Sequence, residues 1–421
     1  MFKKGENKGS GLDTILNIGS FGVNAVVGLL LNFLIVEFYS SESLGVFNIS
    51  YAIYIFLSQA GVFGIHNSVL KYASDFSKNT KELKQVLSSS LSLASIWALL
   101  MLVIAFVLSD VFMTFYDTKS AILSFQIVVV GVFFFILNKI QLSFINGLSK
   151  LKTYAFFLAL RGVLMLSVFF GLVFYDFDPV YLSAVFSFSE IILFLLLSIF
   201  LFNFFQFSSF WNLNWLKKHF QFGRHSFVGS FLMDVGSKTD ILVLGLFVSD
   251  YLVGMYSFVA FFMEGFNQIP IVIRSVTNPK INKLYRTGRS SLLESFLKLV
   301  IKKSYLGFIP FGVVCVLCFP LVIYFSPKFD LWNSWILIAL LMLGPILESG
   351  YSSVQMIYNQ CGFPKIQSLF SAIVFLWNLA FNFLLIPFLG IYGAAIATTS
   401  SFILKIFLMK YYAKSKIGVS I

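Results

Sequence analysis

A membrane-crossing helix is predicted from one stretch of the chain, Leu151–Tyr175, with the sequence LKTYAFFLALRGVLMLSVFFGLVFY. A bilayer core is about 30 Å thick and needs about 20 mainly apolar residues of helix to cross it. This stretch is long enough, and its interior holds a single ionisable side chain, Arg161. It therefore predicts a transmembrane helix with one buried cation.

The same pattern recurs along the whole chain. The other apolar runs cover residues 13–37, 44–67, 86–109, 120–147, 179–205, 222–249, 251–277, 297–325, 331–358, 366–388 and 390–412. Of the 421 residues, 58% are hydrophobic and 11% are charged, which leaves too little polar surface for water-facing domains. We expect an all-α polytopic membrane protein with about 12 transmembrane helices, and not a soluble enzyme.

The charges between these runs predict the topology. Lys and Arg number 30 against 18 Asp and Glu, and the basic loop residues fall almost entirely in alternate loops. Such a bias marks the cytoplasmic side of a membrane. It places both termini in the cytoplasm and explains the net charge of +12 without a nucleic-acid partner.

The two halves of the chain resemble each other. Leu44-Gly45-Val46-Phe47 matches Val253-Gly254-Met255-Tyr256 at an offset of 209 residues, 253 minus 44. We expect a lobe of six helices over 1–205, an interfacial cytoplasmic linker over 206–221, and a second six-helix lobe over 222–421. Pseudo-symmetric repeats are typical of transporters that rock two bundles around a central site.

Ionisable residues inside the predicted spans are the candidates for function, because burying a charge in hydrocarbon is costly. The basic ones are Lys139, Arg161, Lys238, Arg274 and Lys405, and the acidic ones are Glu190, Asp234, Asp240, Glu264 and Glu348. The three Cys and three His residues have no metal-ligand spacing, so no metal site is predicted.

Depth separates the cations. Arg161 and Lys238 lie near the middle of their spans, whereas Lys139 is at the limit of reaching the headgroups, and Arg274 and Lys405 are close enough to extend to them. Asp234 and Lys238, four residues apart, are expected to pair on one helix face. Asp240 needs another partner or is protonated.

Each remaining carboxylate leaves two alternatives open. Glu190, Glu264 and Glu348 either take part in ion coupling, with H⁺ or Na⁺, or neutralise Arg161, Lys139 or one another.

Several motifs resemble those of one family. The stretches Phe222-Gly223-Arg224-His225-Ser226, Thr239–Gly245 and Val253–Ser257 look like the seventh and eighth helices of polysaccharide repeat-unit flippases, the Wzx-type O-antigen transporters. Asn378, Asn382, Ile386-Pro387 and Gly393–Ala397 are similar to the closing helices of the same family. This family belongs to the multidrug/oligosaccharidyl-lipid/polysaccharide exporter superfamily, abbreviated MOP.

The resemblance implies a MATE-like V of two lobes. It implies a non-enzymatic flippase in the bacterial inner membrane that moves undecaprenyl-pyrophosphate-linked oligosaccharide by alternating access. Membrane lipids, a polysaccharide polymerase and a chain-length regulator would be its partners. Arg161, Lys238, Lys139 and Arg274 would bind the pyrophosphate, and Asp240, Asp234, Glu264, Glu348 and Glu190 would serve ion coupling or charge balance. The alternative is a cation-coupled multidrug exporter of the same superfamily.

The first span departs from the related lipid II flippases. It holds Asn17, Asn24 and Asn32 but no cation, which argues against a role in peptidoglycan synthesis.

Overall fold

The computed structural model describes the chain except for residues 1–6, 108, 110–118, 207–208 and 325–327. Within some helices it describes the backbone alone, as at Asn17 and Asp234. Across the described ranges the ordered elements are helices, without strands. The chain divides into two compact units, which are described separately.

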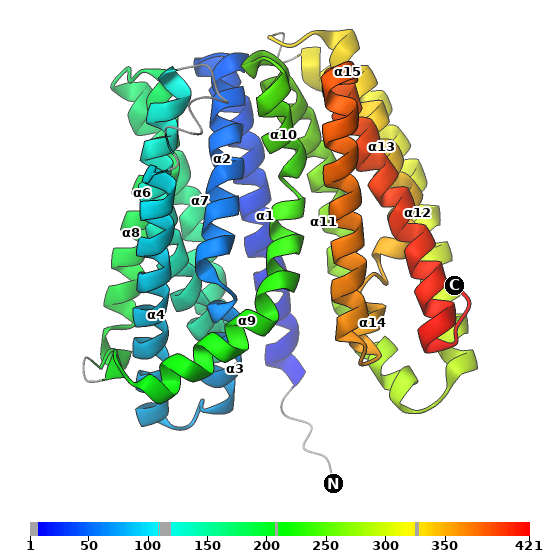
Figure 1. Ribbon diagram of the computed structural model, residues 1–421. Coiled ribbons are helices and arrows are strands. Elements are labelled where there is room, and N and C mark those ends of the chain that lie inside the picture. The colour runs from blue at the N-terminus through cyan, green and yellow to red at the C-terminus, as the bar shows by residue number, and fades with distance from the viewer. Residues whose placement is uncertain (1–6, 108, 110–118, 207–208, 325–327) are drawn as a thin grey trace. The chain divides into compact units, whose positions relative to one another are not determined.

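Unit 1 comprises Met1–Tyr39 and Val46–Val235. Its helices are α1 (Asn7–Phe38), most of α2 (Ser41–Val62), α3 (Ile65–Asp75), α4 (Thr80–Val107), α6 (Lys119–Gly147), α7 (Leu151–Phe174), η1 (Pro179–Ser183), α8 (Ala184–Phe200), η2 (Phe202–Phe204) and α9 (Leu213–Gly236). Figure 1 shows the long helices standing side by side and α9 crossing them obliquely near the ends of α3 and α4. Trp215 fixes this crossing, because its indole nitrogen donates to Gln85 of α4 at 2.9 Å and its ring packs on Tyr72 of α3.

Unit 2 comprises Ser40–Gly45 and Gly236–Ile421. Its helices are α10 (Thr239–Phe247), α11 (Asp250–Arg286), α12 (Ser290–Tyr324), α13 (Leu331–Ser352), α14 (Ile357–Gln360), α15 (Pro364–Tyr412) and a short π-helix, Ala413–Ile417. At one end of this unit Ile281, Leu297, Tyr358 and Met409 form a buried apolar core that holds α11, α12, α14 and α15 together.

The predicted spans are recovered closely. Eight helices are long and apolar enough to cross a membrane among the described residues. One of them, α15, covers two predicted spans: Gly390 has a left-handed φ of 54°, and the Trp377 indole nitrogen donates to the Ser400 hydroxyl at 3.1 Å across the resulting hairpin. A straight helix of 49 residues would be about 74 Å long, more than twice the thickness of a bilayer core.

Three predicted spans are not among the eight. The first, 13–37, is represented by a shorter apolar helix, Gly22–Phe38, and the other two contain charged residues. The span 222–249 is broken between α9 and α10, where Lys238 has φ −122° and ψ 3°. The span 251–277 lies in α11, which is one continuous helix but carries Glu264 and Arg274 in its interior. These are the places where charged side chains interrupt the apolar helices.

The compact units differ from the lobes expected at 1–205 and 222–421. Contacts group α9, up to Val235, with unit 1. The physical reason is a close approach of two glycines: a methyl group on Gly64 would lie 2.5 Å from the Gly223 carbonyl oxygen, and one on Gly223 would lie 2.6 Å from the Phe63 carbonyl oxygen. The segment 206–221 also contains the first two turns of α9.

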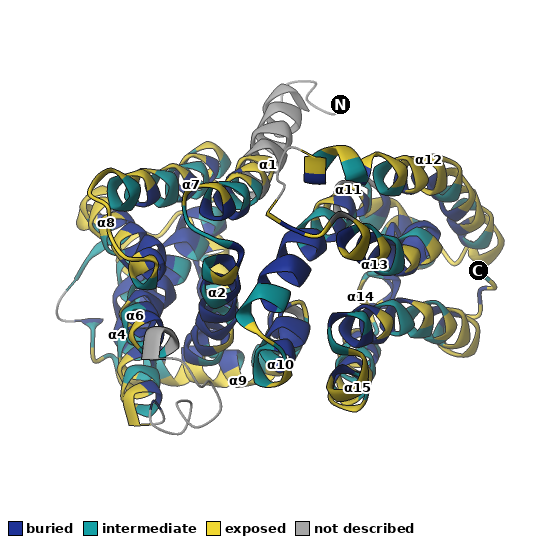
Figure 2. Ribbon diagram, turned by 90° about the horizontal axis from the view of Figure 1, so that it is seen from above, coloured by how far each residue is buried: buried dark blue, intermediate teal, exposed yellow. Residues whose placement is uncertain are grey.

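Large apolar side chains cover the outside of both units. Phe174 is 80% exposed and Ile199 is 73% exposed in unit 1, and Leu306 is 67% exposed in unit 2. Figure 2 shows exposed residues on the outward faces of the helices and buried residues between helices of the same unit. A surface this apolar needs lipid around it. Together with the eight apolar helices, it makes the chain a multi-pass membrane protein, as the sequence predicts.

Candidate functional site

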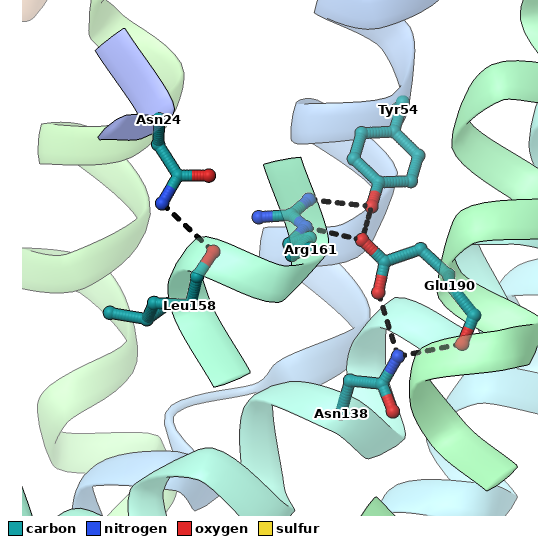
Figure 3. A network of polar contacts seen from close by, with 6 residues as sticks. All are labelled: Asn24, Tyr54, Asn138, Leu158, Arg161 and Glu190. Carbon is teal, nitrogen blue, oxygen red and sulfur yellow. Dashed lines mark hydrogen bonds and ion pairs between the residues drawn. The ribbon is translucent and has the colours of Figure 1, made fainter. Parts of the chain in front are cut away.

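A buried polar network in unit 1 is centred on Glu190 of α8 (Figure 3). The Arg161 Nε atom donates to Glu190 Oε1 at 2.6 Å, and the Tyr54 hydroxyl donates to the same oxygen at 2.8 Å. The Asn138 amide donates to Glu190 Oε2 at 2.7 Å. The Glu190 side chain is 0% exposed. This carboxylate is therefore fully desolvated, and three donors replace its hydration.

Arg161 is held in place by more than this ion pair. Its Nη2 atom donates to the Tyr54 hydroxyl oxygen at 3.0 Å, and its guanidinium carbon lies 4.8 Å from the centre of the Phe135 ring. In Figure 3 the remaining guanidinium nitrogen, Nη1, points away from Glu190 and Tyr54. The Arg161 side chain is 21% exposed. Of the two alternatives for Glu190, the geometry favours neutralisation of Arg161.

Lys139 lies near Arg161. Its Nζ atom donates to the Gln59 side-chain oxygen at 2.7 Å and lies 5.9 Å from the centre of the same Phe135 ring. The two cationic centres, Arg161 Cζ and Lys139 Nζ, can be separated by no more than the sum of 4.8 and 5.9 Å. Unit 1 thus places two cations around one aromatic ring.

In unit 2 the helix expected to carry both Asp234 and Lys238 on one face is interrupted: α9 ends at Gly236, and Lys238 precedes α10 in a non-helical conformation. The Lys238 Nζ atom donates to Glu264 Oε1 on α11 at 2.6 Å. The side chain of Asp234 lies outside the described residues.

Asp240 has hydrogen-bond partners of its own, as one of the two alternatives from the sequence predicts. It is 7% exposed, its Oδ2 atom accepts a short hydrogen bond from the Tyr256 hydroxyl, and its Oδ1 atom accepts from the Ile241 main-chain nitrogen at 2.9 Å. Asn382 and Thr398 of α15 are also buried, and in the described part of the chain Asn382 Oδ1 and Thr398 Oγ1 have no hydrogen-bond partner.

A further polar group, the second in unit 2, contains Arg274, Glu348 and Lys405. Arg274 Nη1 donates to the Gln355 side-chain oxygen at 2.9 Å, and Lys405 Nζ lies 3.9 Å from Glu348 Oε2. Lys405 also lies 4.1 Å from the centre of the Phe402 ring. Lys405 therefore lies close to a buried carboxylate and an aromatic ring of its own unit, and its extension to the headgroups stays a prediction.

The structure thus brings Arg161, Lys139 and Glu190 together in unit 1. In unit 2 it places Lys238, Glu264 and Asp240 in one group and Arg274 and Glu348 in another. Sequence reasoning missed the neutral partners Tyr54, Asn138, Gln59, Tyr256 and Gln355. Polar side chains inside apolar runs were the available signal, although Tyr is also common at membrane interfaces. Among the residues described, no three His, Cys, Asp or Glu side chains are grouped to hold a metal.

Comparisons with known proteins establish the fold. No protein-family model matches the sequence, and no curated protein matches it either. Among solved structures, it is similar to the lipid II flippase MurJ in an inward closed conformation, with a TM-score of 0.77, 17% identity, and coverage of 95% of this chain and 87% of that one.

It is equally similar to an inward-facing multidrug resistance MATE family transporter of the MOP superfamily, with a TM-score of 0.76 and 12% identity over 96% of this chain and 98% of that one. A MOP superfamily transporter from Pyrococcus furiosus matches with a TM-score of 0.66 and 13% identity over 96% and 94% of the two chains. These likenesses confirm the predicted fold class: the chain has the helical fold of MOP-superfamily transporters.

Proposed function

We propose that this protein is a lipid-linked oligosaccharide flippase. It moves undecaprenyl-pyrophosphate-linked O-antigen or capsule repeat units from the cytoplasmic to the periplasmic leaflet by alternating access. It lies in a bacterial inner membrane with both termini in the cytoplasm. It performs no covalent chemistry, and it works beside a polysaccharide polymerase and a chain-length regulator. The similarity in fold to a lipid II flippase supports this class of substrate.

The observation that carries the proposal is the placement of Arg161 and Lys139 around Phe135. A pyrophosphate diester has two negative charges and loses much hydration on leaving water. Guanidinium binds phosphate oxygens through directed N–H groups, and ammonium binds them as a compact charge. Glu190 cancels the formal charge of Arg161 but leaves its Nη1 group pointing elsewhere, so this group and the Lys139 ammonium group are the donors that would contact the phosphates.

Lys238 and Arg274 have secondary roles in this proposal. Lys238 is bonded to Glu264 at 2.6 Å, and its charge is balanced there. Arg274 has a neutral hydrogen-bond partner in Gln355 and is a further contact for the phosphate groups.

We assign ion coupling to Asp240, with H⁺ or Na⁺ as the coupling ion. Among the described carboxylates in the predicted spans, Asp240 accepts hydrogen bonds from a tyrosine hydroxyl and a main-chain N–H. Neither of these two donors is a cation. Such a carboxylate can change its protonation or bind an ion without first breaking an ion pair.

A cation-coupled multidrug exporter is the second candidate, because one of the similar structures is a multidrug resistance MATE family transporter. A cationic drug would need uncompensated carboxylates. Glu190 and Glu264 are each already bonded to a cation at 2.6 Å. Asp240 remains to contact such a drug, whereas two cations, Lys139 and Arg274, have neutral side chains as hydrogen-bond acceptors and favour an anionic substrate.

The test is transport by the full-length protein in liposomes containing a fluorescent undecaprenyl-pyrophosphate oligosaccharide. We expect Lys139→Gln and the paired change Arg161→Gln with Glu190→Gln each to slow transfer at least about tenfold, since a hydrogen bond to a charged group contributes about 1.5–3 kcal/mol. The paired change avoids leaving a buried carboxylate without its cation. Lys298→Gln is the matched control, because Lys298 is 57% exposed and bonded to Glu294 on one helix surface.

Transfer at the wild-type rate by both variants would contradict the site. Efflux of cationic dyes by the wild-type protein, without transfer of the lipid, would instead establish the multidrug exporter.

A further inference from the structure

The group formed by Arg274, Glu348 and Lys405 has a feature that the Arg161–Glu190 network lacks. Glu348 of α13 is 2% exposed and interacts electrostatically with cations from two other helices, Lys405 of α15 and Arg274 of α11. The nearest cationic atom, Lys405 Nζ, is 3.9 Å from Glu348 Oε2, which is beyond hydrogen-bond distance. The carboxylate is thus attracted by two cations but tightly bonded to neither.

Two buried polar atoms in this group also lack partners. Within the described residues, Glu348 Oε1 and Arg274 Nε are buried without a hydrogen bond. Buried polar atoms are almost always hydrogen-bonded, and an exception needs an explanation. Glu190, by contrast, accepts from three donors. Two cations and one carboxylate give the group a net charge of +1. An anion would accept from the Arg274 Nε donor, whereas Glu348 Oε1 is an acceptor that a proton on the carboxyl group would satisfy.

We propose that Arg274 and Lys405 form a binding site for a diphosphate diester. The bound anion replaces Glu348 as the counter-ion of these two cations, and Glu348 then binds one proton. The inference rests on the proposed function for the identity of the anion. It makes Glu348 the group that links binding of the headgroup to proton uptake.

The charges balance in this exchange. Before binding, the two cations and ionised Glu348 sum to +1. A diphosphate diester brings two negative charges, which neutralise Arg274 and Lys405. An ionised Glu348 would then be a desolvated charge without a counter-ion, a state that a buried carboxyl group avoids by taking up a proton. With Glu348 protonated the site is neutral.

The surroundings of Glu348 allow this exchange. Tyr305 of α12 is the other titratable group that faces it, and the Tyr305 hydroxyl is already donating to the Leu347 carbonyl oxygen at 2.7 Å. The Lys405 side chain is 21% exposed, against 3% for Glu348, so a ligand can approach through the cation. The Phe402 ring under Lys405 keeps the ammonium group from turning away.

The experiment measures proton uptake directly. The full-length protein in detergent is titrated with P1,P2-dimethyl diphosphate, whose charge is constant near neutral pH, by calorimetry in buffers with different ionisation enthalpies. We expect the wild type to take up about one proton per bound anion. Glu348→Gln, which resembles the protonated carboxyl group, should bind at least as tightly and take up none. Arg274→Gln and Lys405→Gln should each weaken binding at least about tenfold.

Arg274→Lys and Lys298→Gln serve as controls. The first keeps the positive charge and should retain proton uptake, and the second changes an exposed cation outside the group. Proton uptake by Glu348→Gln equal to that of the wild type would overturn the proposal. So would unchanged affinity in folded Arg274→Gln and Lys405→Gln, or no binding of the diester by the wild type.

The outcome is separable from that of the proposed function. A wild-type protein that binds the diester with proton uptake but transfers no lipid would disprove the flippase and leave this site standing. Normal lipid transfer by Glu348→Gln with an unchanged proton count would disprove the exchange and leave the flippase standing.

Discussion

Gly45 and Gly254 occupy equivalent positions in the two sequence repeats, and each packs against the first turn of the other's helix within unit 2. A methyl group on Gly45 would overlap the Asp250 carbonyl oxygen, and one on Gly254 would overlap the Ser41 carbonyl oxygen. The offset is 209 residues for both pairs, 254 minus 45 and 250 minus 41. The contact is reciprocal: the first turn of α2 and the first turn of α11, both in unit 2, each meet the glycine of the other.

Substitution of either glycine by alanine should therefore destabilise the protein. The obstacle is main chain rather than a movable side chain, so we expect a loss of about 1–3 kcal/mol for Gly45→Ala and for Gly254→Ala. The midpoint of thermal unfolding in detergent, followed by tryptophan fluorescence, measures this loss. Gly265→Ala in α11 is the control, since nothing lies within 4 Å of its added methyl group. Equal midpoints for all three variants would contradict the close contact.

Arg161 and Glu190 should behave as one unit in stability. Removing a single partner of a buried ion pair leaves an uncompensated charge and costs about 3–5 kcal/mol. We expect Arg161→Gln to lower the unfolding midpoint strongly, and the paired change with Glu190→Gln to recover much of the loss. A double-mutant cycle on the purified protein checks this. Additive effects would mean that the pair at 2.6 Å contributes no coupling.

The Arg161–Glu190 pair also shows how far sequence reasoning reaches. Hydropathy located Arg161 and Glu190 inside their spans, because the apolar runs around them are long. Their pairing was only one of several alternatives, since the partners lie on α7 and α8 and spacing along one helix tests only neighbours three or four residues away. Spacing predicted one pair, Asp234 with Lys238, but the helix that would have carried both residues on one face ends at Gly236. The span boundaries depend on composition, whereas the site depends on how helices pack.

The packing of α9 on unit 1 should weaken in acid. His219 of α9 is fully buried, its Nδ1 atom lies 2.8 Å from the Ser68 hydroxyl oxygen, and burial lowers its pKa from 6.5 to about 3. The unfolded state therefore binds more protons than the folded state between these values, and stability rises with pH across this window. The loss at about pH 5 is roughly 2 kcal/mol relative to neutral pH.

Unfolding midpoints measured from neutral pH down to about pH 4 test this dependence. His219→Gln should reduce the slope, because glutamine does not titrate. His225→Gln, on an exposed position of the same helix, should keep it. A His219→Gln protein with the wild-type slope would assign the acid sensitivity to other groups.

The last prediction concerns a carbonyl oxygen that a proline leaves exposed in α12. Pro320 has no N–H to donate to the Val316 carbonyl four residues earlier, and the Trp335 indole nitrogen of α13 donates to that oxygen at 3.0 Å instead. Trp335→Phe should thus cost about 1 kcal/mol beyond its change in packing. In a Pro320→Ala background the alanine N–H can reach Val316, so the same Trp335→Phe change should cost less. Equal costs in the two backgrounds would show that α12 and α13 are not joined by this hydrogen bond.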